Sequence, residues 1–265
     1  MKGRVLIVAG SDSGGGAGIQ ADIKTVTMFG GFAMTAIAAL TVQDTTAVHD
    51  VMAIPASFVA HQMEVVLKDI GADAVKIGML ANAEIVAAVA DMLEAHAAEV
   101  PVVLDPVMVA TSGGVLLVND AVSALKSRLV SRATVVTPNI PETEVLVGRP
   151  VRNVADMTAA GREILKLGPR AVLVKGGHLD APEVIDILVT ADGVHEFRGE
   201  KIVSRNTHGT GCTLSSAIAA GLARGDDLVQ AVARARAYVA EGIRLAPGFG
   251  SGHGPLNHVD AVAAI

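Results

Sequence analysis

The sequence predicts an α/β fold in which helices cover both faces of a central, mostly parallel sheet. Short apolar runs of strand length alternate along the chain with longer segments of helical periodicity, which is the pattern of right-handed βαβ units. The short runs are mostly apolar, as strands are when helices bury them from both sides. Both observations favour a parallel sheet between two layers of helices.

The predicted strands and helices follow one another in order. The strand-like runs are Val5–Ala9, Ala36–Val42, Ala74–Ile77, Val102–Leu104, Thr134–Val136 and Ala171–Val174. The helical segments between them are Phe58–Ile70, Ala83–His96, Val115–Val130 and Val154–Leu167. Ligands of such sheets bind at the carboxyl ends of the strands, so motifs that directly follow these runs are the first candidates for a site.

The last third of the sequence departs from this alternation. Two apolar runs flank Asp192-Gly193, a pair typical of hairpin turns, which predicts a small antiparallel edge. The hairpin strands are Val184–Val189 and Val194–Phe197, and the helices expected after them are Leu214–Ala223 and Leu228–Ala246. The sequence contains no internal repeat or low-complexity linker, so we expect residues 1–265 to form a single domain.

The composition argues against nucleic-acid and membrane partners. The formal net charge is -6 and the isoelectric point is about 5.7, which gives no long-range attraction to phosphate backbones or anionic lipids. No apolar stretch reaches the ~20 residues of a membrane span. The single cysteine, Cys212, cannot form an internal disulfide, so a cytoplasmic location is expected.

The strongest motif is a glycine turn that opens a helix, Asn206–Thr213. Gly209 and Gly211 let a ligand approach backbone N–H groups, and the helix dipole adds positive charge, so the turn can bind a phosphoryl group during its transfer. Cys212 lies at the helix N-terminus, a setting that lowers the pKa of a thiol, and it is a candidate to accept a proton from a substrate hydroxyl. An ordinary capped helix with a buried, inert cysteine is the competing interpretation.

A second glycine-rich segment, Gly10–Gly18, follows the first strand. Its glycines alternate, which matches neither the dinucleotide-binding fingerprint nor a Walker A loop. A flexible loop that gives a small ligand access to the backbone fits the pattern better. Asp22, one turn into the next helix, is able to reach a substrate hydroxyl, or else it is an ordinary acid of a first helical turn.

Two acids and a lysine lie at the exits of later strands. Asp105 follows one strand and Glu142 lies shortly after another, and Mg²⁺ is commonly held by one or two carboxylates together with water and phosphate oxygens. Glu142 also lies three residues after Asn139, which is the pattern of a capping box. Lys175, which two glycines follow, can neutralise a phosphate or be a surface lysine in a tight turn.

Taken together, these motifs resemble those of the ribokinase-like superfamily, and within it the hydroxymethylpyrimidine/phosphomethylpyrimidine kinases of thiamine biosynthesis. The resemblance spans essentially the whole chain and implies a three-layer sandwich with a mostly parallel sheet and a small antiparallel edge. Most members of the superfamily carry an aspartate where this chain has Cys212, whereas the pyrimidine-kinase group carries cysteine. The matching segments are residues 9–22, 41–45, 76–80, 105–108, 139–142, 174–178 and 209–212.

The resemblance implies an activity as well as a fold. ATP-dependent phosphorylation of 4-amino-5-hydroxymethyl-2-methylpyrimidine would give its monophosphate, and a second phosphorylation would give the diphosphate. ATP is then the co-substrate and Mg²⁺ the cofactor. The family suggests a cytoplasmic homodimer that binds small molecules and neither nucleic acid nor membranes.

The resemblance also implies roles for single residues. The catalytic set would be Cys212, Gly209, Gly211 and Lys175. Gln43 would bind the aminopyrimidine through its amide, which offers both a donor and an acceptor, and Asp22 would orient the hydroxymethyl group. The pyrimidine pocket would be lined by Gly10, Ala17, Val42, Met79 and Val107. The nucleotide would contact Asn139, Lys175, Thr207 and Gly209, and the metal would contact Asp105 and Glu142.

Three other functions remain open at this point. A pyridoxine or pyridoxal kinase could use the same scaffold, because related kinases accept such vitamers. A ligand-binding regulator would keep the pocket but release no ADP. A thiol hydrolase would need a histidine beside Cys212; His208 is near in sequence, but the flanking glycines suit phosphate better. No role is assigned to His208 or to His178.

Overall fold

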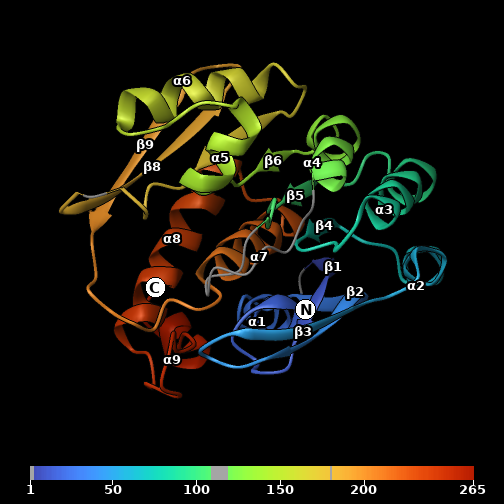
Figure 1. Ribbon diagram of the computed structural model, residues 1–265, viewed down its shortest axis with the longest axis horizontal. Helices are drawn as coiled ribbons and strands as arrows, with labels where there is room; N and C mark the ends of the chain where they lie inside the picture. Colours follow the sequence, from blue (N-terminus) through green and yellow to red (C-terminus); the bar gives the residue numbers. More distant parts are fainter. Residues whose placement is uncertain (1–2, 109–118, 180) are drawn as a thin grey trace.

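The computed structural model describes residues 3–108, 119–179 and 181–265. Its centre is one nine-stranded sheet in the order β3-β2-β1-β4-β5-β6-β7-β8-β9 (Figure 1). The strands from β2 to β7 in this order run parallel to their neighbours, which confirms the predicted mostly parallel sheet. The strands are β1 (Arg4–Asp12), β2 (Phe32–Gln43), β3 (Val48–Ala53), β4 (Ala74–Ile77), β5 (Val102–Leu104), β6 (Val135–Val136), β7 (Ala171–Val174), β8 (Glu183–Thr190) and β9 (Val194–Glu200).

Helices pack on both faces of this sheet and complete three layers (Figure 1). One layer contains α1, α7, α8 and α9, whose buried side chains form an apolar cluster with one face of the sheet. The other layer contains α2 to α6 and forms a second cluster with the opposite face. The helices are α1 (Gly18–Met28), α2 (Ala56–Asp69), α3 (Ala83–His96), α4 (Asn119–Leu125), α5 (Ile140–Val147), α6 (Val154–Leu165), α7 (Thr210–Ala223), α8 (Leu228–Arg244) and α9 (His258–Ala263).

The predicted central strands and several helices are confirmed. β4, β5 and β7 have the predicted bounds, because each is a short run that the sheet buries completely. Helix α3 also has its predicted bounds; the Asn82 side chain accepts the N–H of Ile85 and caps its first turn. The predicted hairpin is formed by the antiparallel pair β8 and β9.

Other elements differ from the prediction. β3 pairs antiparallel with β2 and forms a second antiparallel edge; most of its residues are exposed, so no continuous apolar run marks it in the sequence. Helix α7 begins at Thr210 rather than Leu214, because the glycine turn itself opens the helix. Helix α9 was not predicted. The helix predicted at Val115–Val130 is α4 followed by a π-helical stretch, Lys126–Val130; residues 115–118 lie outside the described part.

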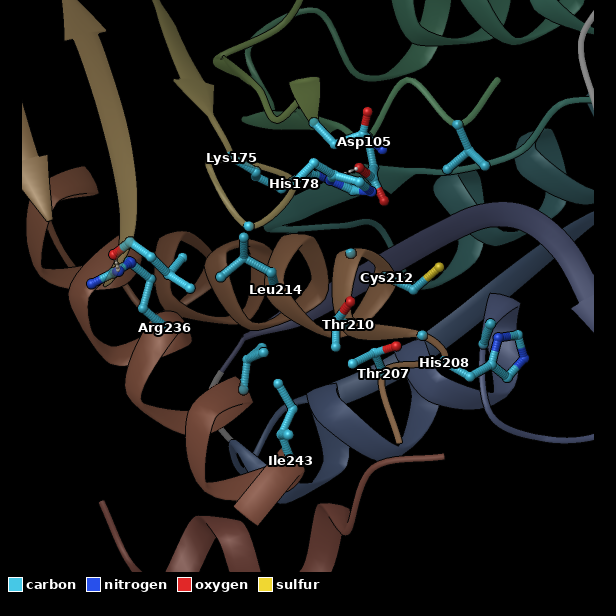
Figure 2. A pocket seen from close by; sticks show the side chains of 18 of the residues that line it. Asp105, Lys175, His178, Thr207, His208, Thr210, Cys212, Leu214, Arg236 and Ile243 are labelled. Atoms are coloured by element: carbon cyan, nitrogen blue, oxygen red, sulfur yellow. Dashed lines mark hydrogen bonds and ion pairs between the residues drawn. The ribbon is translucent and has the colours of Figure 1, made fainter. Parts of the chain in front are cut away.

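The topology brings the candidate motifs to one edge of the sheet. Parallel strands have their carboxyl ends on the same side, and the segments after β1, β5, β6 and β7 leave the sheet there. Helix α7 packs against β1, β4 and β5, and Figure 2 shows its first turn facing these segments. Among the described helices, none combines the length and the hydropathy that crossing a bilayer would require.

Candidate active site

A cavity of about 1010 Å³ opens at this edge of the sheet. Its walls come from the segment after β1, the ends of β2 and β4, the exits of β5, β6 and β7, the hairpin β8–β9, and helices α7 and α8. Figure 2 shows Asp105 and Lys175 on one side, and Thr207, Thr210 and Cys212 at the start of α7 on the other. Motifs that are far apart in the sequence therefore meet around one space.

The glycine turn at the start of α7 is in direct backbone contact with the first glycine segment. Gly209 is the N-cap of α7 in the left-handed conformation, with a φ of 80°, and a Cβ there would come within 1.9 Å of the Gly16 carbonyl oxygen. A Cβ on Gly211 would lie 3.3 Å from Lys175 Nζ. Because the first N–H groups of a helix have no partner inside it, the turn presents donors and a positive dipole end beside a lysine. This is the geometry of an anion site.

Lys175 is held at the cavity by Asp105. The Lys175 Nζ lies 2.8 Å from Asp105 Oδ1, which also accepts a hydrogen bond of 3.2 Å from the Thr137 hydroxyl. Burial alone would lower the pKa of Lys175, but the carboxylates of Asp105 and Glu142 raise it. The ammonium is therefore charged, and its side chain is only 13% exposed. The alternative of a surface lysine in a tight turn is wrong.

Glu142 caps helix α5 and lines the cavity as well. Its Oε2 accepts the Asn139 backbone N–H at 2.8 Å, and its own N–H donates to Asn139 Oδ1 at 2.9 Å, which is the capping box left open by the sequence. Both residues also line the cavity. Burial raises the pKa of Glu142 to about 7, with Lys175 opposing and Asp105 adding to the rise. A cation beside Glu142 would favour its ionised form.

The two acids suit a metal ion that arrives with phosphates. In the part of the chain that the structure describes, no group of three or more His, Cys, Asp or Glu side chains is placed to hold a metal, and Asp105 is already paired with Lys175. Mg²⁺ prefers few carboxylates, with phosphate oxygens and water completing its shell. Glu142 and Asp105 fit that small contribution, whereas an all-protein cage would not fit.

The sequence analysis missed a buried ion pair behind the glycine turn. Lys76, inside β4, is fully buried, and its Nζ lies 2.9 and 2.8 Å from the two carboxylate oxygens of Asp22. Ser216 Oγ donates to Asp22 Oδ1 at 2.7 Å. Burial alone would lower the pKa of Lys76, but Asp22, Cys212 and Asp105 raise it. A lysine within a short apolar strand is the signal that could have revealed the pair, because lysine is almost never fully buried alone.

The direct contact expected between Asp22 and the substrate does not match this arrangement. Asp22 is fully buried and lies outside the cavity lining, whereas Lys76 belongs to that lining. Both Asp22 oxygens already accept hydrogen bonds from Lys76. In this structure Asp22 lies behind Lys76, and its carboxylate is not exposed to the cavity.

Cys212 lines the cavity, but its thiol is not activated in the predicted way. Burial raises the pKa of Cys212 to about 11; Lys76 and a backbone hydrogen bond from Gly18 oppose the rise, while Asp22 and Asp105 add to it. The expectation of a lowered pKa at a helix N-terminus was wrong, because desolvation and two carboxylates outweigh the cationic lysine. Cys212 is thus a protonated thiol at neutral pH.

Alkylation of Cys212 should report this raised pKa. We expect iodoacetamide to react slowly at neutral pH and about tenfold faster with each pH unit toward a pH of about 11, because only the thiolate attacks. The intact mass measures the rate cleanly, since the chain has no other cysteine. Lys76→Met should slow the reaction at fixed pH by removing the cation. A rate that levels off near pH 7 would contradict the raised pKa.

Most residues expected around the pyrimidine line the same cavity. They are Gly10, Ala17, Gln43, Met79 and Val107. Val42 is the exception: side chains alternate along a strand, and its neighbours Thr41 and Gln43 line the cavity. Val42 consequently points to the other face of β2, where it is 59% exposed. The expected nucleotide contacts all belong to the lining, namely Asn139, Lys175, Thr207 and Gly209.

A network around Asp12 joins the two glycine segments, and the sequence analysis gave it no role. Asp12 Oδ1 accepts the N–H of Gly14 at 2.8 Å, and Oδ2 accepts the N–H groups of Gly16 at 3.0 Å and Ala17 at 2.8 Å. His208 Nε2 lies 2.8 Å from Asp12 Oδ2. An acid inside the first glycine segment and a histidine directly before Gly209 were the visible signals. The network closes the first segment against the start of α7.

The whole architecture is shared with a solved kinase. The structure of an ADP complex of Bacillus subtilis pyridoxal kinase matches the chain with a TM-score of 0.92 at 32% sequence identity, over 100% of both chains. A sheet of this topology with a glycine turn of this kind at its carboxyl edge defines the class. The chain is a ribokinase-like kinase, which is a phosphotransferase.

Sequence comparison places the chain within that class. Residues 12–257 match the family model of phosphomethylpyrimidine kinase, and the chain belongs to this family. It is 46% identical to the hydroxymethylpyrimidine/phosphomethylpyrimidine kinase of Rhizobium meliloti, with 96% of both chains covered. It is 50% identical to the thiamine biosynthesis bifunctional protein ThiED of Geobacter sulfurreducens over 97% of its own length, and it spans 52% of that relative. The family expected from the motifs is confirmed.

Proposed function

We propose that this chain transfers a phosphoryl group from ATP to the hydroxymethyl group of 4-amino-5-hydroxymethyl-2-methylpyrimidine, and then to the monophosphate that forms. One observation carries the proposal: the amide of Gln43, the thiol of Cys212 and the turn at Gly209 line one cavity. An aminopyrimidine needs a partner that both donates and accepts hydrogen bonds, and phosphoryl transfer needs positive groups beside a base. The names of the relatives in this family support the same activity.

The positive groups of the cavity bind the phosphoryl group, and Cys212 takes part in proton transfer. The amides at Gly209 and Gly211 and the ammonium of Lys175 bind and orient the transferring phosphoryl group. Lys76 keeps a second positive charge near the Cys212 sulfur. The thiolate form of Cys212 accepts the hydroxyl proton of the substrate and becomes the thiol. The transition state of phosphoryl transfer is loose, so this proton leaves late, and the small fraction of Cys212 that is ionised at neutral pH is the active base.

ATP and Mg²⁺ complete the proposed reaction. We place the phosphates of ATP along the wall that contains Asn139, Thr207 and Lys175. Mg²⁺, when bound, would neutralise the charge of the phosphates, and Asp105 and Glu142 are the residues that would hold it, directly or through water. The solved relative was determined in complex with ADP, which supports the proposal that this chain binds ATP. The apolar wall formed by α7 and α8 suits the base of the nucleotide.

The function is tested by incubating the chain with MgATP and the hydroxymethylpyrimidine and by resolving the products over time. We expect the monophosphate first and the diphosphate later, with one ADP released at each step. Pyridoxine and pyridoxal are assayed in parallel, because the solved relative is a pyridoxal kinase. Preferential turnover of these alcohols would replace the proposal by a pyridoxal kinase. Release of ADP excludes a regulator that only binds, and the absence of esterase activity excludes a thiol hydrolase.

We also propose a cytoplasmic homodimer of a single-domain chain, formed through the edge of β2 and β3. Apolar side chains gather on these paired strands, and those of Val42 and Met52 are each 59% exposed. The patch consists of Leu40, Val42 and Met52, which the strand register places on one face of the sheet. Exposed apolar patches of this kind mark interaction surfaces, and a second copy offers the same patch in return. The single cysteine supports the cytoplasm.

Met52→Glu should convert this dimer into a monomer. A charge in the centre of a self-complementary apolar patch has to be desolvated twice in the dimer, once for each copy. Light scattering at micromolar concentration measures the mass, and the thermal midpoint checks the fold. Val259→Glu is the matched control, because Val259 is 65% exposed on α9, outside the patch. A wild-type chain that is monomeric throughout this concentration range would contradict the dimer.

A further inference from the structure

The Asp12–His208 pair lies beside Gln43 and has no part in the chemistry described above. Asp12 and His208 are 3% and 7% exposed. His208 Nε2 lies 2.8 Å from Asp12 Oδ2 and 3.4 Å from Gln43 Nε2. At the other end of the amide, Gln43 Oε1 lies 3.2 Å from Thr41 Oγ1. The amide of Gln43 is therefore held between a histidine and a threonine at the cavity wall.

The partners of Asp12 decide where the histidine carries its proton. Burial would raise the pKa of Asp12, but hydrogen bonds from His208, Ala17 and Gly14 lower it, so the group is an aspartate. An aspartate only accepts hydrogen bonds. His208 therefore carries a proton on Nε2, the ring atom that faces Asp12.

This proton decides which end of the Gln43 amide faces the histidine. The Nε2 proton of His208 is donated to Asp12 Oδ2 at 2.8 Å, and at 3.4 Å the same N–H still presents its positive end to the Gln43 amide. An amide oxygen is attracted to that N–H and an amide nitrogen is repelled by it, so the oxygen belongs on the His208 side and the nitrogen on the Thr41 side. Thr41 permits this exchange, because its single hydroxyl proton goes to Ser11 O at 3.0 Å and leaves Oγ1 able to accept. The opposite orientation would bring two donors together at His208.

The ring of His208 is itself fixed in place. A Cβ on Gly16 would come within 2.5 Å of His208 Cδ2, so the ring packs directly on the first glycine segment. The backbone N–H of His208 donates to Gly254 O at 3.1 Å. The backbone N–H of His253, the residue before Gly254, donates to Thr45 O at 2.7 Å. Thr45 lies two residues after Gln43 in the chain. The C-terminal segment therefore fixes the position of His208 relative to the strand that contains Gln43.

We propose that His208, oriented by Asp12, is a positioning residue that fixes the Gln43 amide and makes the site selective for a ring that carries an amino group beside a ring nitrogen. In the fixed orientation one amide N–H and one oxygen lone pair are left for the cavity. The amide N–H can donate to a ring nitrogen, and the amide oxygen can accept from an amino group, when the two substrate groups lie in matching positions. An amide that was free to turn by about 180° would also accept a ring with these two groups exchanged. The inference rests on the proposed function, because it takes an aminopyrimidine as the substrate.

The test combines a substitution of His208 with removal of the amino group from the substrate. Wild type and His208→Leu are assayed with the aminopyrimidine alcohol and with the same alcohol lacking the amino group. We expect His208→Leu to raise KM for the aminopyrimidine about tenfold, the effect of one misplaced hydrogen bond, with kcat changed less than about threefold. KM for the deamino alcohol should stay within about threefold of wild type. His208→Gln, whose amide can donate to Asp12 and Gln43, should restore the selectivity.

The outcomes separate the inference from the function on which it rests. Equal losses with both alcohols would make His208 merely structural and would overturn the inference, as would a wild type that does not distinguish the two alcohols. A wild type that phosphorylates neither alcohol would instead overturn the proposed function. Should His208→Leu fail to fold by its thermal midpoint, His208→Asn replaces it. Its shorter amide cannot serve both partners, and the same loss of selectivity is expected.

Discussion

Cys212→Ala should lower kcat by about 10²–10⁴, with KM for the alcohol changed by less than about threefold. The sulfur lines the cavity beside the charge of Lys76, so its removal takes away the proton acceptor and leaves the binding contacts. Gln43→Ala should do the reverse and raise KM with little effect on kcat. Steady-state kinetics with the aminopyrimidine alcohol measure both. Equal effects of the two variants on both constants would contradict the roles assigned here.

The pH dependence supplies a control for this prediction. The pKa of Cys212 is raised to about 11, so its thiolate fraction grows with pH across the neutral and alkaline range, and kcat of the wild type should rise with it. Cys212→Asp places the superfamily's usual base at the same position. A carboxylate remains ionised across this range, so the variant should stay active with a flatter profile. A profile that is flat for the wild type and unchanged in Cys212→Ala would exclude Cys212 as the base.

Gly209→Ala is expected to abolish both phosphorylation steps, with a loss of more than about 10²-fold in kcat. The added Cβ would come within 1.9 Å of the Gly16 carbonyl oxygen, and backbone atoms cannot yield as a flexible side chain does. Either the glycine segment or the start of α7 must move, and both contribute to the site. We also expect a lower free energy of unfolding, by more than about 2 kcal/mol, measured by denaturant titration.

Gly225→Ala is the matched control for this substitution. Gly225 also has a positive φ, 89°, but a Cβ there would meet no atom within 4 Å. The variant therefore bears the strain of the left-handed conformation, about 1–2 kcal/mol, without the collision. Its kcat should equal that of the wild type. If both alanine variants lost activity equally, backbone strain alone would explain the result, and the contact between the two glycine segments would have no catalytic meaning.

The sequence predicted what depends on local pattern. Buried strands such as β4 and β5 are short apolar runs, and the exits of such strands indicated Asp105 and Lys175 before any coordinates. It did not predict β3, whose exposed residues have no continuous apolar run. Hydrophobicity alone could not place Val42, since the side of the strand it occupies depends on where the neighbouring Gln43 points.

The charges of the site were harder to predict, because they depend on contacts between distant segments. The pairing of Lys76 with Asp22 joins residues that are 54 positions apart, and the pairing of His208 with Asp12 joins residues 196 positions apart. The pKa of Cys212 depends on its burial and on the nearby Lys76–Asp22 pair. The rule that a helix N-terminus lowers a thiol pKa takes neither effect into account. Lone polar residues in apolar strands, such as Lys76, are the most useful warning of such pairs.

The bonds from the C-terminal segment to His208 and Thr45 determine when the protein becomes competent during synthesis. The wall that contains Gln43 is complete only after Gly254 has been translated, and the helical layer that α1 begins over β1 is complete only after α7 has been translated. A ligand stabilises only a chain that can bind it, so neither nucleotide nor alcohol can assist the nascent chain. Until then the sheet leaves apolar surface uncovered, which favours aggregation.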